Sequence, residues 1–323
     1  MNRFKIHLIA FGGAVTLVSM FASSAHVQNF SDWSAPVNAE MIEGTSSQLN
    51  TPFSDGCPIQ APDGLSLFIA SNRPAEFLGQ NIWVAHRASA EDPWGAPELL
   101  PAPINSDADD FCPSPTRGHG LYFVSARGGP GTCGGADIYL TRLGPEGWEE
   151  PQNLGCQINS PAGEASPSYF EDESGHSILY FSSTRPGGFS DPDAGTPDSD
   201  IYFSVDFGPA QLNPTLNTAN DDSRPNVRHN GREIVFDSTR PLTLGGPDIW
   251  TASRESLADN WSEPVHLDAP INSSASETRA SLSWDGTTMV FGSTRMGSEL
   301  GSNGLPSNDI YVTTREKVPG NGG

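Results

Sequence analysis

The phrase Ser-x-Arg occurs five times at a nearly constant spacing, and this repeat is the feature that most constrains what the chain can fold into. Successive arginines of the phrase are 54, 58, 55 and 55 residues apart. They are Arg73, Arg127, Arg185, Arg240 and Arg295. A regular internal repeat predicts an array of similar structural units.

Each repeat contains the pattern of two adjoining β-strands. Before the Ser stands an apolar run (LFIAS, LYFVS, LYFSS, IVFDS, MVFGS), and after a Gly/Pro-rich gap comes a second run (NIWVA, DIYLT, DIYFS, DIWTA, DIYVT). The gap GGPGTCGG before Asp137 resembles a phosphate-binding loop, but no lysine is near and a strand follows where such a loop needs a helix. We therefore interpret the gap as the connection of a hairpin.

Two further phrases keep the same period and complete the unit. Trp-x-x-Pro begins at Trp33, Trp94, Trp148 and Trp261, and one copy has lost its Trp. An asparagine stands five residues before an acid that recurs as Asp55, Asp110, Glu164, Asp222 and Glu277. Each unit thus holds four short strands: A from the acid to a tight turn, B ending in Ser-x-Arg, C opening with Asp-Ile-Tyr, and D at Trp-x-x-Pro. This pattern is typical of a propeller blade.

The predicted fold is an all-β, five-bladed β-propeller with four antiparallel strands per blade. The blades fall at approximately 50–100, 105–155, 159–215, 217–268 and 272–315. The repeats begin with a D strand at 33–39 and end with a C strand, so the N-terminal strand should complete the last blade and remove free sheet edges. Residues 26–317 form a single domain in this prediction, and 318–323 form a disordered tail.

The repeated phrases resemble a known family. The P-D-G turn at 62–64, L-Y-F-x-S-x-R and D-I-Y are similar to the WD40-like β-propeller repeat of bacterial envelope proteins, the type found in TolB, over residues 33 to 315. Propellers of the TolB type usually have six blades and a second domain, whereas this chain has five repeats. The resemblance implies an architecture more than an activity, because propellers support many unrelated functions.

The chain begins with the pattern of an export signal and is strongly acidic. Residues 1–25 read as a secretory signal peptide, with small residues before a cleavage site after Ala25, so we expect a periplasmic or secreted product that does not span the membrane. The remainder carries 15 basic and 39 acidic residues, a net charge of −24. This charge excludes nucleic acid and anionic lipid as partners and favours cations, basic partners or neutral glycans. An alternative explanation of this acidic composition is adaptation of the protein surface to high salt.

Four cysteines in an exported chain predict two disulfides. Cys57 and Cys112 both stand seven residues after the repeat asparagine, at equivalent positions of neighbouring inner strands. Cys133 lies in a B–C loop and Cys156 in the following D–A connection. We therefore predict Cys57–Cys112 and Cys133–Cys156.

The D–A and B–C connections emerge on one side of the ring, which we call the mouth face; the opposite side, with the A–B and C–D turns, is the turn face. The mouth face collects the five A-strand acids, the five Ser-x-Arg arginines, and the C-strand acids Asp137, Asp200, Asp248 and Asp309. Charges repeated in every blade are more often part of the fold than of a site. We expect each arginine to pair with the C-strand acid of its blade, which would leave the five A-strand acids for water, a cation or a ligand.

Departures from symmetry indicate function more directly. The B–C loop of the third blade, 186–199, carries Asp191, Asp193 and Asp198, which could bind Ca²⁺ or form an acidic lid. Arg224 and Arg279 occupy the A-strand position that cysteine or serine holds elsewhere. They could clamp a ligand carboxylate or neutralise Asp222 and Glu277.

No catalytic phrase is present, so the sequence favours a monomeric binding or scaffolding module without a required cofactor, whose mouth face contacts an envelope protein, a peptide or a glycan. The alternative is a glycoside hydrolase or lyase that uses A-strand carboxylates, because five-bladed glycosidases carry carboxylates on inner strands.

Overall fold

A computed structural model describes residues 29–189 and 198–318. The expected signal peptide, Asp191 and Asp193, and all of the expected tail except Val318 lie outside the described residues. Within the described ranges, no helix is long and apolar enough to cross a membrane.

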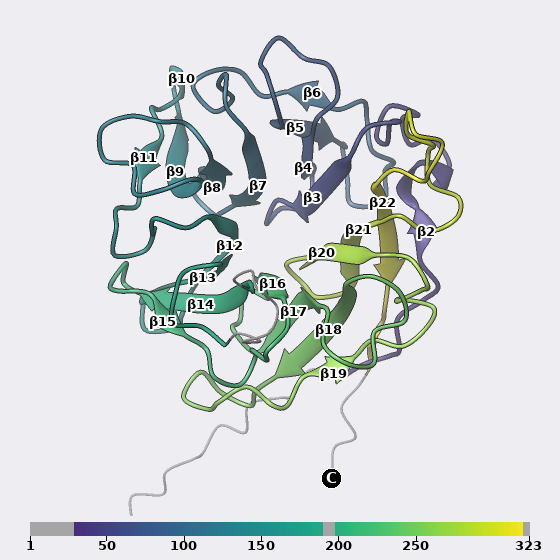
Figure 1. Ribbon diagram of the computed structural model, residues 1–323. Helices are drawn as coiled ribbons and strands as arrows, with labels where there is room; N and C mark the ends of the chain where they lie inside the picture. Colours follow the sequence, from purple (N-terminus) through teal and green to yellow (C-terminus); the bar gives the residue numbers. More distant parts are fainter. Residues whose placement is uncertain (1–28, 190–197, 319–323) are drawn as a thin grey trace, which may run out of the picture.

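Five small antiparallel sheets are arranged as a ring around a central axis, as Figure 1 shows. Blade 1 consists of β3 (Asp55–Gln60), β4 (Ser66–Ser71), β5 (Asn81–His86) and β6 (Glu98–Leu99). Blade 2 consists of β7 (Asp110–Pro115), β8 (Gly120–Ser125), β9 (Asp137–Gly144) and β11 (Gln152–Asn153), with the short β10 (Gly147–Trp148) also on β9. Blade 3 consists of β12 (Glu164–Glu171), β13 (Ser177–Ser183), β14 (Asp200–Val205) and β15 (Gln211–Leu212).

The last two blades repeat this order. Blade 4 consists of β16 (Asp222–Val227), β17 (Glu233–Ser238), β18 (Asp248–Ser253) and β19 (Val265–His266). Blade 5 consists of β20 (Glu277–Leu282), β21 (Thr288–Ser293), β22 (Asp309–Thr314) and the N-terminal β2 (Val37–Asn38), which precedes the 3₁₀ helix η1 (Ala39–Met41). The predicted five-bladed all-β fold and the predicted closure by an N-terminal strand are confirmed.

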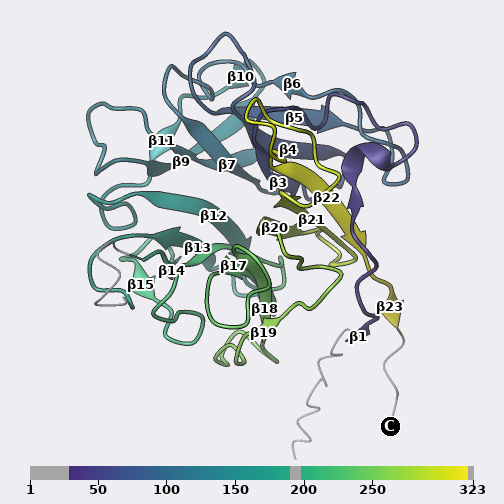
Figure 2. The ribbon, with the colours of Figure 1, turned by 45° about the vertical axis from the view of Figure 1, so that its right-hand side comes forward.

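A second pairing adds to the closure of the ring. The strands β1 (Asn29–Phe30) and β23 (Lys317–Val318) form a two-stranded antiparallel ribbon beside blade 5, which Figure 2 shows where the two ends of the chain meet. The ends of the described chain are therefore held together on one side of the ring.

The core lies between the blades and follows the repeat. The side chain two residues before the Ser of each Ser-x-Arg phrase is completely buried, and these side chains are Ile69, Phe123, Phe181, Phe236 and Phe291. A large apolar side chain at the same place in five B strands gives every blade the same surface to pack against its neighbour.

The repeat asparagine joins each blade to the next. Asn105, in the connection to blade 2, accepts a hydrogen bond from the Ile82 N–H of blade 1 at 2.8 Å and donates to the Ile82 carbonyl at 2.9 Å. The same pair of bonds forms at Asn159, Asn217 and Asn272, and Asn50 of blade 1 bonds Ile310 of blade 5. The asparagine therefore provides hydrogen-bond partners for the N–H and the carbonyl of the second residue of each C strand.

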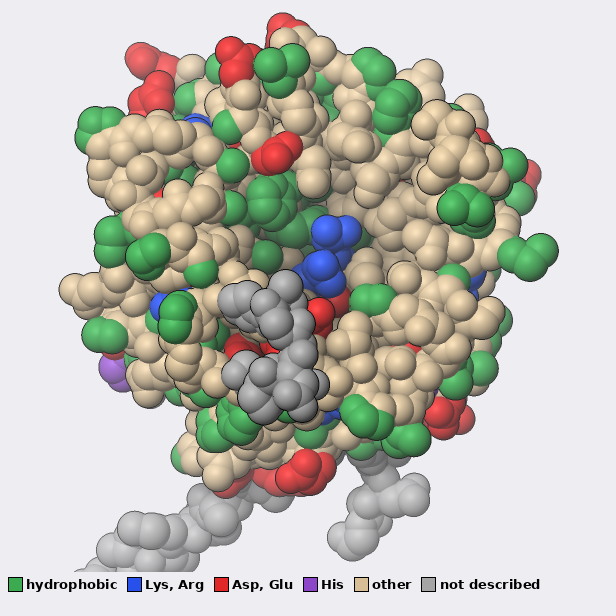
Figure 3. All heavy atoms as spheres, viewed as in Figure 1, with side chains coloured by type: hydrophobic (Ala, Val, Ile, Leu, Met, Phe, Trp, Pro, Cys, Tyr) green, Lys and Arg blue, Asp and Glu red, His purple; other side chains and the backbone are tan. Residues whose placement is uncertain are grey.

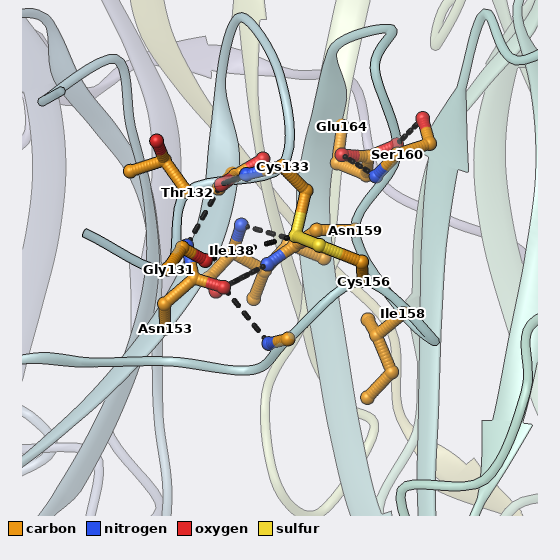
Figure 4. Close-up of a disulfide and its surroundings, with 12 residues drawn as sticks. Gly131, Thr132, Cys133, Ile138, Asn153, Cys156, Ile158, Asn159, Ser160 and Glu164 are labelled. Atoms are coloured by element: carbon orange, nitrogen blue, oxygen red, sulfur yellow. Dashed lines mark hydrogen bonds between the residues drawn. A yellow bond between two sulfur atoms is a disulfide. The ribbon is translucent and has the colours of Figure 1, made fainter. Parts of the chain in front are cut away.

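Both predicted disulfides are confirmed. Cys57–Cys112 joins the A strands of blades 1 and 2, and Cys133–Cys156 joins the B–C loop of blade 2 to the connection that enters blade 3. Figure 4 shows the second disulfide next to Asn153 and Asn159, whose side chains bond at 2.9 Å. Two disulfides fit an exported protein.

Candidate functional site

The five A-strand acids are bonded to the Ser-x-Arg arginines and are buried. Nη2 of Arg73 lies 2.5 Å from Asp55, that of Arg127 2.7 Å from Asp110, and that of Arg185 2.9 Å from Glu164. Arg295 pairs with Glu277 at 3.0 Å, and Arg240 pairs with Asp222. All five carboxylate side chains are inaccessible to solvent. A buried ion pair of this kind is expensive to break, because either partner would remain charged and unpaired.

The expected pairing of these arginines with the C-strand acids is therefore wrong. The Nε of Arg73 donates to the hydroxyl of Ser71, two residues earlier, and its two Nη atoms donate to the carbonyls of Gln48 and Leu49 in the D–A connection. These three contacts turn the guanidinium toward the A strand, where Asp55 lies. Equivalent Ser and carbonyl contacts hold the other four arginines.

Each A-strand acid has a second partner that the spacing analysis missed. The residue after the repeat asparagine is always Ser or Thr, and both its N–H and its hydroxyl donate to the acid; at Thr51 the two bonds to Asp55 are 2.6 and 2.7 Å. The others are Ser106, Ser160, Thr218 and Ser273. The sequence feature that could have identified this partner is the hydroxyl residue that follows the asparagine in all five repeats.

The C-strand acids hold the B–C loops and the D strands. Asp137 accepts bonds from the Cys133 N–H and from Asn153, and Asp248 accepts from the Leu244 N–H and contacts His266 Nε2 at 2.7 Å. Asp309 accepts bonds from Asn38, the Glu299 N–H and Ser307. Burial, and secondly the nearby Asp222, raise the pKa of Asp200 to about 7.

The channel wall is formed by one residue per blade in an unusual backbone conformation. Cys57, Cys112, Ser166, Arg224 and Arg279 have φ between +47° and +56°, and each lies where the A–B pairing shifts register. The left-handed conformation is unfavourable for residues other than glycine, and a β-bulge is a place where it occurs. The bulge turns these five side chains toward one small cavity on the axis, which they line together.

Two of the five bulge residues are arginines, and they meet a single acid. Arg224 Nη1 lies 2.5 Å from Asp237 Oδ2, and the Arg279 N–H donates to Asp237 Oδ1 at 2.9 Å. The Arg224 side chain is 28% exposed, whereas that of Asp237 is 1% exposed. Figure 3 shows basic side chains in the central hollow with acidic side chains beside them. Of the two predicted roles, neutralisation of Asp222 and Glu277 is wrong, because those acids already have partners.

Asp237 is the functional candidate that the repeat analysis missed. It stands directly before the Ser of Ser-x-Arg, where the other blades carry Ala70, Val124, Ser182 and Gly292. A charge at this position in one blade of five was the signal that could have identified it. Burial raises the pKa of Asp237, and Arg224 and Arg279 oppose that rise.

A pocket of about 280 Å³ adjoins this cluster between blades 3 and 4. Arg224 and Asp237 form part of its wall, and the remaining wall includes the hydroxyl side chains of Ser182, Thr184, Ser199, Ser223 and Thr239. Hydroxyl groups both donate and accept hydrogen bonds, so the pocket suits a polar ligand.

The turn-face end of the channel is covered by a stack of side chains. The Arg117 guanidinium lies 4.2 Å from the ring centre of Trp284, and the His229 ring lies 4.1 Å from it at an interplanar angle of 14°. Arg117 belongs to blade 2 and Trp284 to blade 5, which are not neighbours in the ring, so their contact crosses the channel end. This stack narrows access to the bulge residues from the turn face.

The calcium hypothesis rested on the long loop of blade 3. Asp191 and Asp193 lie outside the described residues, so only Asp198 of the three is placed. Within the described ranges, no group of three His, Cys, Asp or Glu side chains is arranged to hold a metal ion. Calcium binding at this loop stays a prediction.

No family model matches the sequence, and no curated protein matches it. Solved structures share its fold. An α-L-arabinofuranosidase from Lactobacillus brevis is 15% identical with a TM-score of 0.55, over 86% of this chain and 94% of that one. A xylan β-1,4-xylosidase from Bacillus halodurans C-125 is 14% identical with a TM-score of 0.54, over 85% and 54%.

TolB from Acinetobacter baumannii is 15% identical with a TM-score of 0.44, over 80% of this chain and 53% of that one. At this score the likeness carries no argument, so the TolB character of the repeats stays a prediction. What the comparisons establish is the architecture: the chain has the five-bladed propeller fold.

Proposed function

We propose that the protein binds a glycan at the mouth-face end of its channel. The observation that carries this proposal is the cluster of Arg224, Arg279 and Asp237, which breaks the five-fold repeat at the accessible end of a channel whose other end is covered. The A-strand acids and the Ser-x-Arg arginines of all five blades are paired with each other, so the unrepeated arginines of the channel are the charged groups that a ligand can bind. The concave pocket next to them is lined mainly by residues with small hydroxyl side chains.

A glycan fits this site better than a peptide does. Six residues with hydroxyl side chains line the adjoining pocket and no large apolar residue does, so it offers little to an apolar anchor residue of a peptide. The structures that share the fold include enzymes named for arabinose- and xylose-containing substrates. At 14 to 15% identity these names indicate only which ligands to test first.

Glycoside hydrolysis is the second candidate, and Asp237 is the observation that favours it. It is a carboxyl group on the wall of the pocket, and burial raises its pKa, as a general acid requires. Hydrolysis needs a second carboxylate at a suitable separation. The A-strand carboxylates proposed for that role are held by arginines, so Asp200, with its pKa raised to about 7, is the nearest alternative for testing.

Calorimetric titration with xylo- and arabino-oligosaccharides tests the proposal. We expect the wild type to bind one class and Arg224→Gln to lose at least about 10-fold in affinity, while the exposed control Arg142→Gln, which also removes one positive charge, binds normally. Equal affinity in wild type and Arg224→Gln would refute the site. New reducing ends released by the wild type and not by Asp237→Asn would favour the hydrolase.

A further inference from the structure

We infer that the glycan carries a carboxylate, as an isolated uronate residue on an otherwise neutral chain, and that Arg279 binds it. This inference rests on the proposed function and names the chemical class of its ligand. It follows from the hydrogen-bond partners of the two channel arginines, Arg224 and Arg279. These partners differ from those of the five Ser-x-Arg arginines.

The charges of the cluster do not balance. Two guanidinium groups face one carboxylate, Asp237, and that carboxylate takes its side-chain bond from Arg224 and only a backbone N–H from Arg279. The Arg279 guanidinium makes no hydrogen bond to any described residue, and its Nε atom is buried without a partner. Arg279 is half-buried, and a buried N–H donor without a partner is costly, so a ligand that accepts a hydrogen bond from it would be favoured.

Arg279 is also placed to reach a ligand in the channel. Its side chain extends from blade 5 toward blade 1, where a side chain added at Gly56 would meet its Nη1 atom. Gly56 therefore leaves room for the guanidinium, and Arg279 joins Arg224 in lining the axial cavity. Two guanidinium groups on adjacent blades line one cavity, and guanidinium N–H groups are the donors that suit a carboxylate.

The charge of the whole chain limits what kind of acidic ligand can enter. The chain carries a net charge of −22, so a polymer with a negative charge on every residue would be repelled during approach. A neutral chain with one carboxylate places its single charge in the locally positive channel and its hydroxyl groups against the hydroxyl-lined pocket. This is the class of ligand that the site accommodates with least conflict.

Titration with a matched pair of ligands tests the inference: a xylo-oligosaccharide with one glucuronate branch and the unbranched oligosaccharide of the same length. We expect the wild type to bind the acidic ligand at least about 10-fold more tightly, with a preference that falls as salt is added. Arg279→Gln should bind the two equally, because it keeps the backbone N–H on Asp237 and removes only the cation. The control Arg142→Gln should keep the preference.

The outcomes separate the two proposals. Equal binding of both ligands by the wild type, or an unchanged preference in Arg279→Gln, would overturn the carboxylate inference and leave glycan binding standing. Binding of neither ligand would overturn both. If a short peptide with a free terminal carboxylate binds and both saccharides fail, the site recognises a carboxylate and the assignment to a glycan is wrong.

Discussion

At the scale of single residues, arginine serves two different purposes in this protein. Arg240 donates to the Ser238 hydroxyl at 2.9 Å, to the Leu216 carbonyl at 2.6 Å and to Asp222, so its guanidinium is saturated by the fold. Arg279 has no such side-chain bonds, and burial, followed by the neighbouring cation Arg224, lowers its pKa to about 10. The first kind of arginine stabilises a blade, and the second kind is available to a ligand.

The free energy of unfolding should distinguish the two kinds. Arg240→Gln leaves Asp222 buried without a counter-charge, and we expect a loss of about 3 to 5 kcal/mol. Arg279→Gln removes a half-buried cation whose side chain makes no hydrogen bond to a described residue, so we expect no loss or a small gain. Urea unfolding of both variants measures this, and a loss above about 2 kcal/mol in Arg279→Gln would show that its charge supports the fold.

A second prediction at this scale concerns Asp200, whose pKa is raised to about 7. The folded state holds the proton more tightly than the unfolded chain does. The stability that Asp200 contributes is therefore fully present below its ordinary pKa of about 3.8 and is lost as the pH rises to about 7. Asp200→Asn should remove this decline, so that at pH 8 the variant is more stable than the wild type by roughly 1 to 2 kcal/mol.

Urea unfolding between pH 4 and pH 8 checks this expectation, with the exposed Asp32→Asn as the control. If the wild type and Asp200→Asn lose stability in parallel over that range, another group is responsible for the decline.

At the scale of strands and blades, the asparagine contact between neighbouring blades is the repeated link. Asn105 is buried and bonds both backbone groups of Ile82 as well as the Leu100 carbonyl at 2.7 Å. Asn105→Ala leaves the Ile82 N–H and carbonyl without this partner, and we expect a loss of about 2 to 4 kcal/mol. The exposed Asn260→Ala should change the stability by less than about 0.5 kcal/mol. Similar small effects in both variants would mean that water replaces the asparagine.

Most of the strands, the number of blades and the two disulfides could be predicted from the sequence. The B and C strands are short apolar runs with β-branched and aromatic residues, and turn residues bound them, so their positions and the number of blades follow from local pattern. The disulfides follow because equivalent positions of neighbouring repeats lie near each other. The repeats begin with a D strand and end with a C strand, which predicts that the N-terminal D strand completes the last blade.

The site could be predicted only in part, and the reasons are physical. Arg224 and Arg279 stand out because two blades have arginine where the others have cysteine or serine. The left-handed backbone that aims them at the channel could not be predicted, since cysteine, serine and arginine do not favour it. The partner of each Ser-x-Arg arginine depends on how Ser71 and its equivalents orient a long side chain, which residue spacing does not record.

At the scale of the whole molecule, the ring depends on contacts between its two ends. Val37 and Asn38 pair with Val312 and Tyr311, and the Asn38 side chain bonds Asp309 at 3.1 Å. A chain that starts at residue 39 should therefore unfold at a lower temperature than one that starts at residue 29, and should associate through the exposed edge of β22. Thermal unfolding and light scattering measure both effects. Equal midpoints and a monomeric short chain would show that the first strand does not close the ring.

The ring also determines where function can be placed. Five similar blades satisfy their own charges, and the covered turn face leaves one accessible end of the channel. The unrepeated Arg224, Arg279 and Asp237 lie toward that end. This is why a glycan site is assigned to the channel mouth and not to the repeated acids.

The most direct test of this account is a crystal structure of the protein soaked with the glucuronate-branched xylo-oligosaccharide. We predict saccharide density at the mouth-face end of the channel, with its carboxylate within hydrogen-bond distance of Arg279 and Arg224 and its hydroxyl groups toward Ser223 and Thr239. Density for the saccharide elsewhere on the protein, with an empty channel at a concentration that saturates binding in solution, would contradict the central claim.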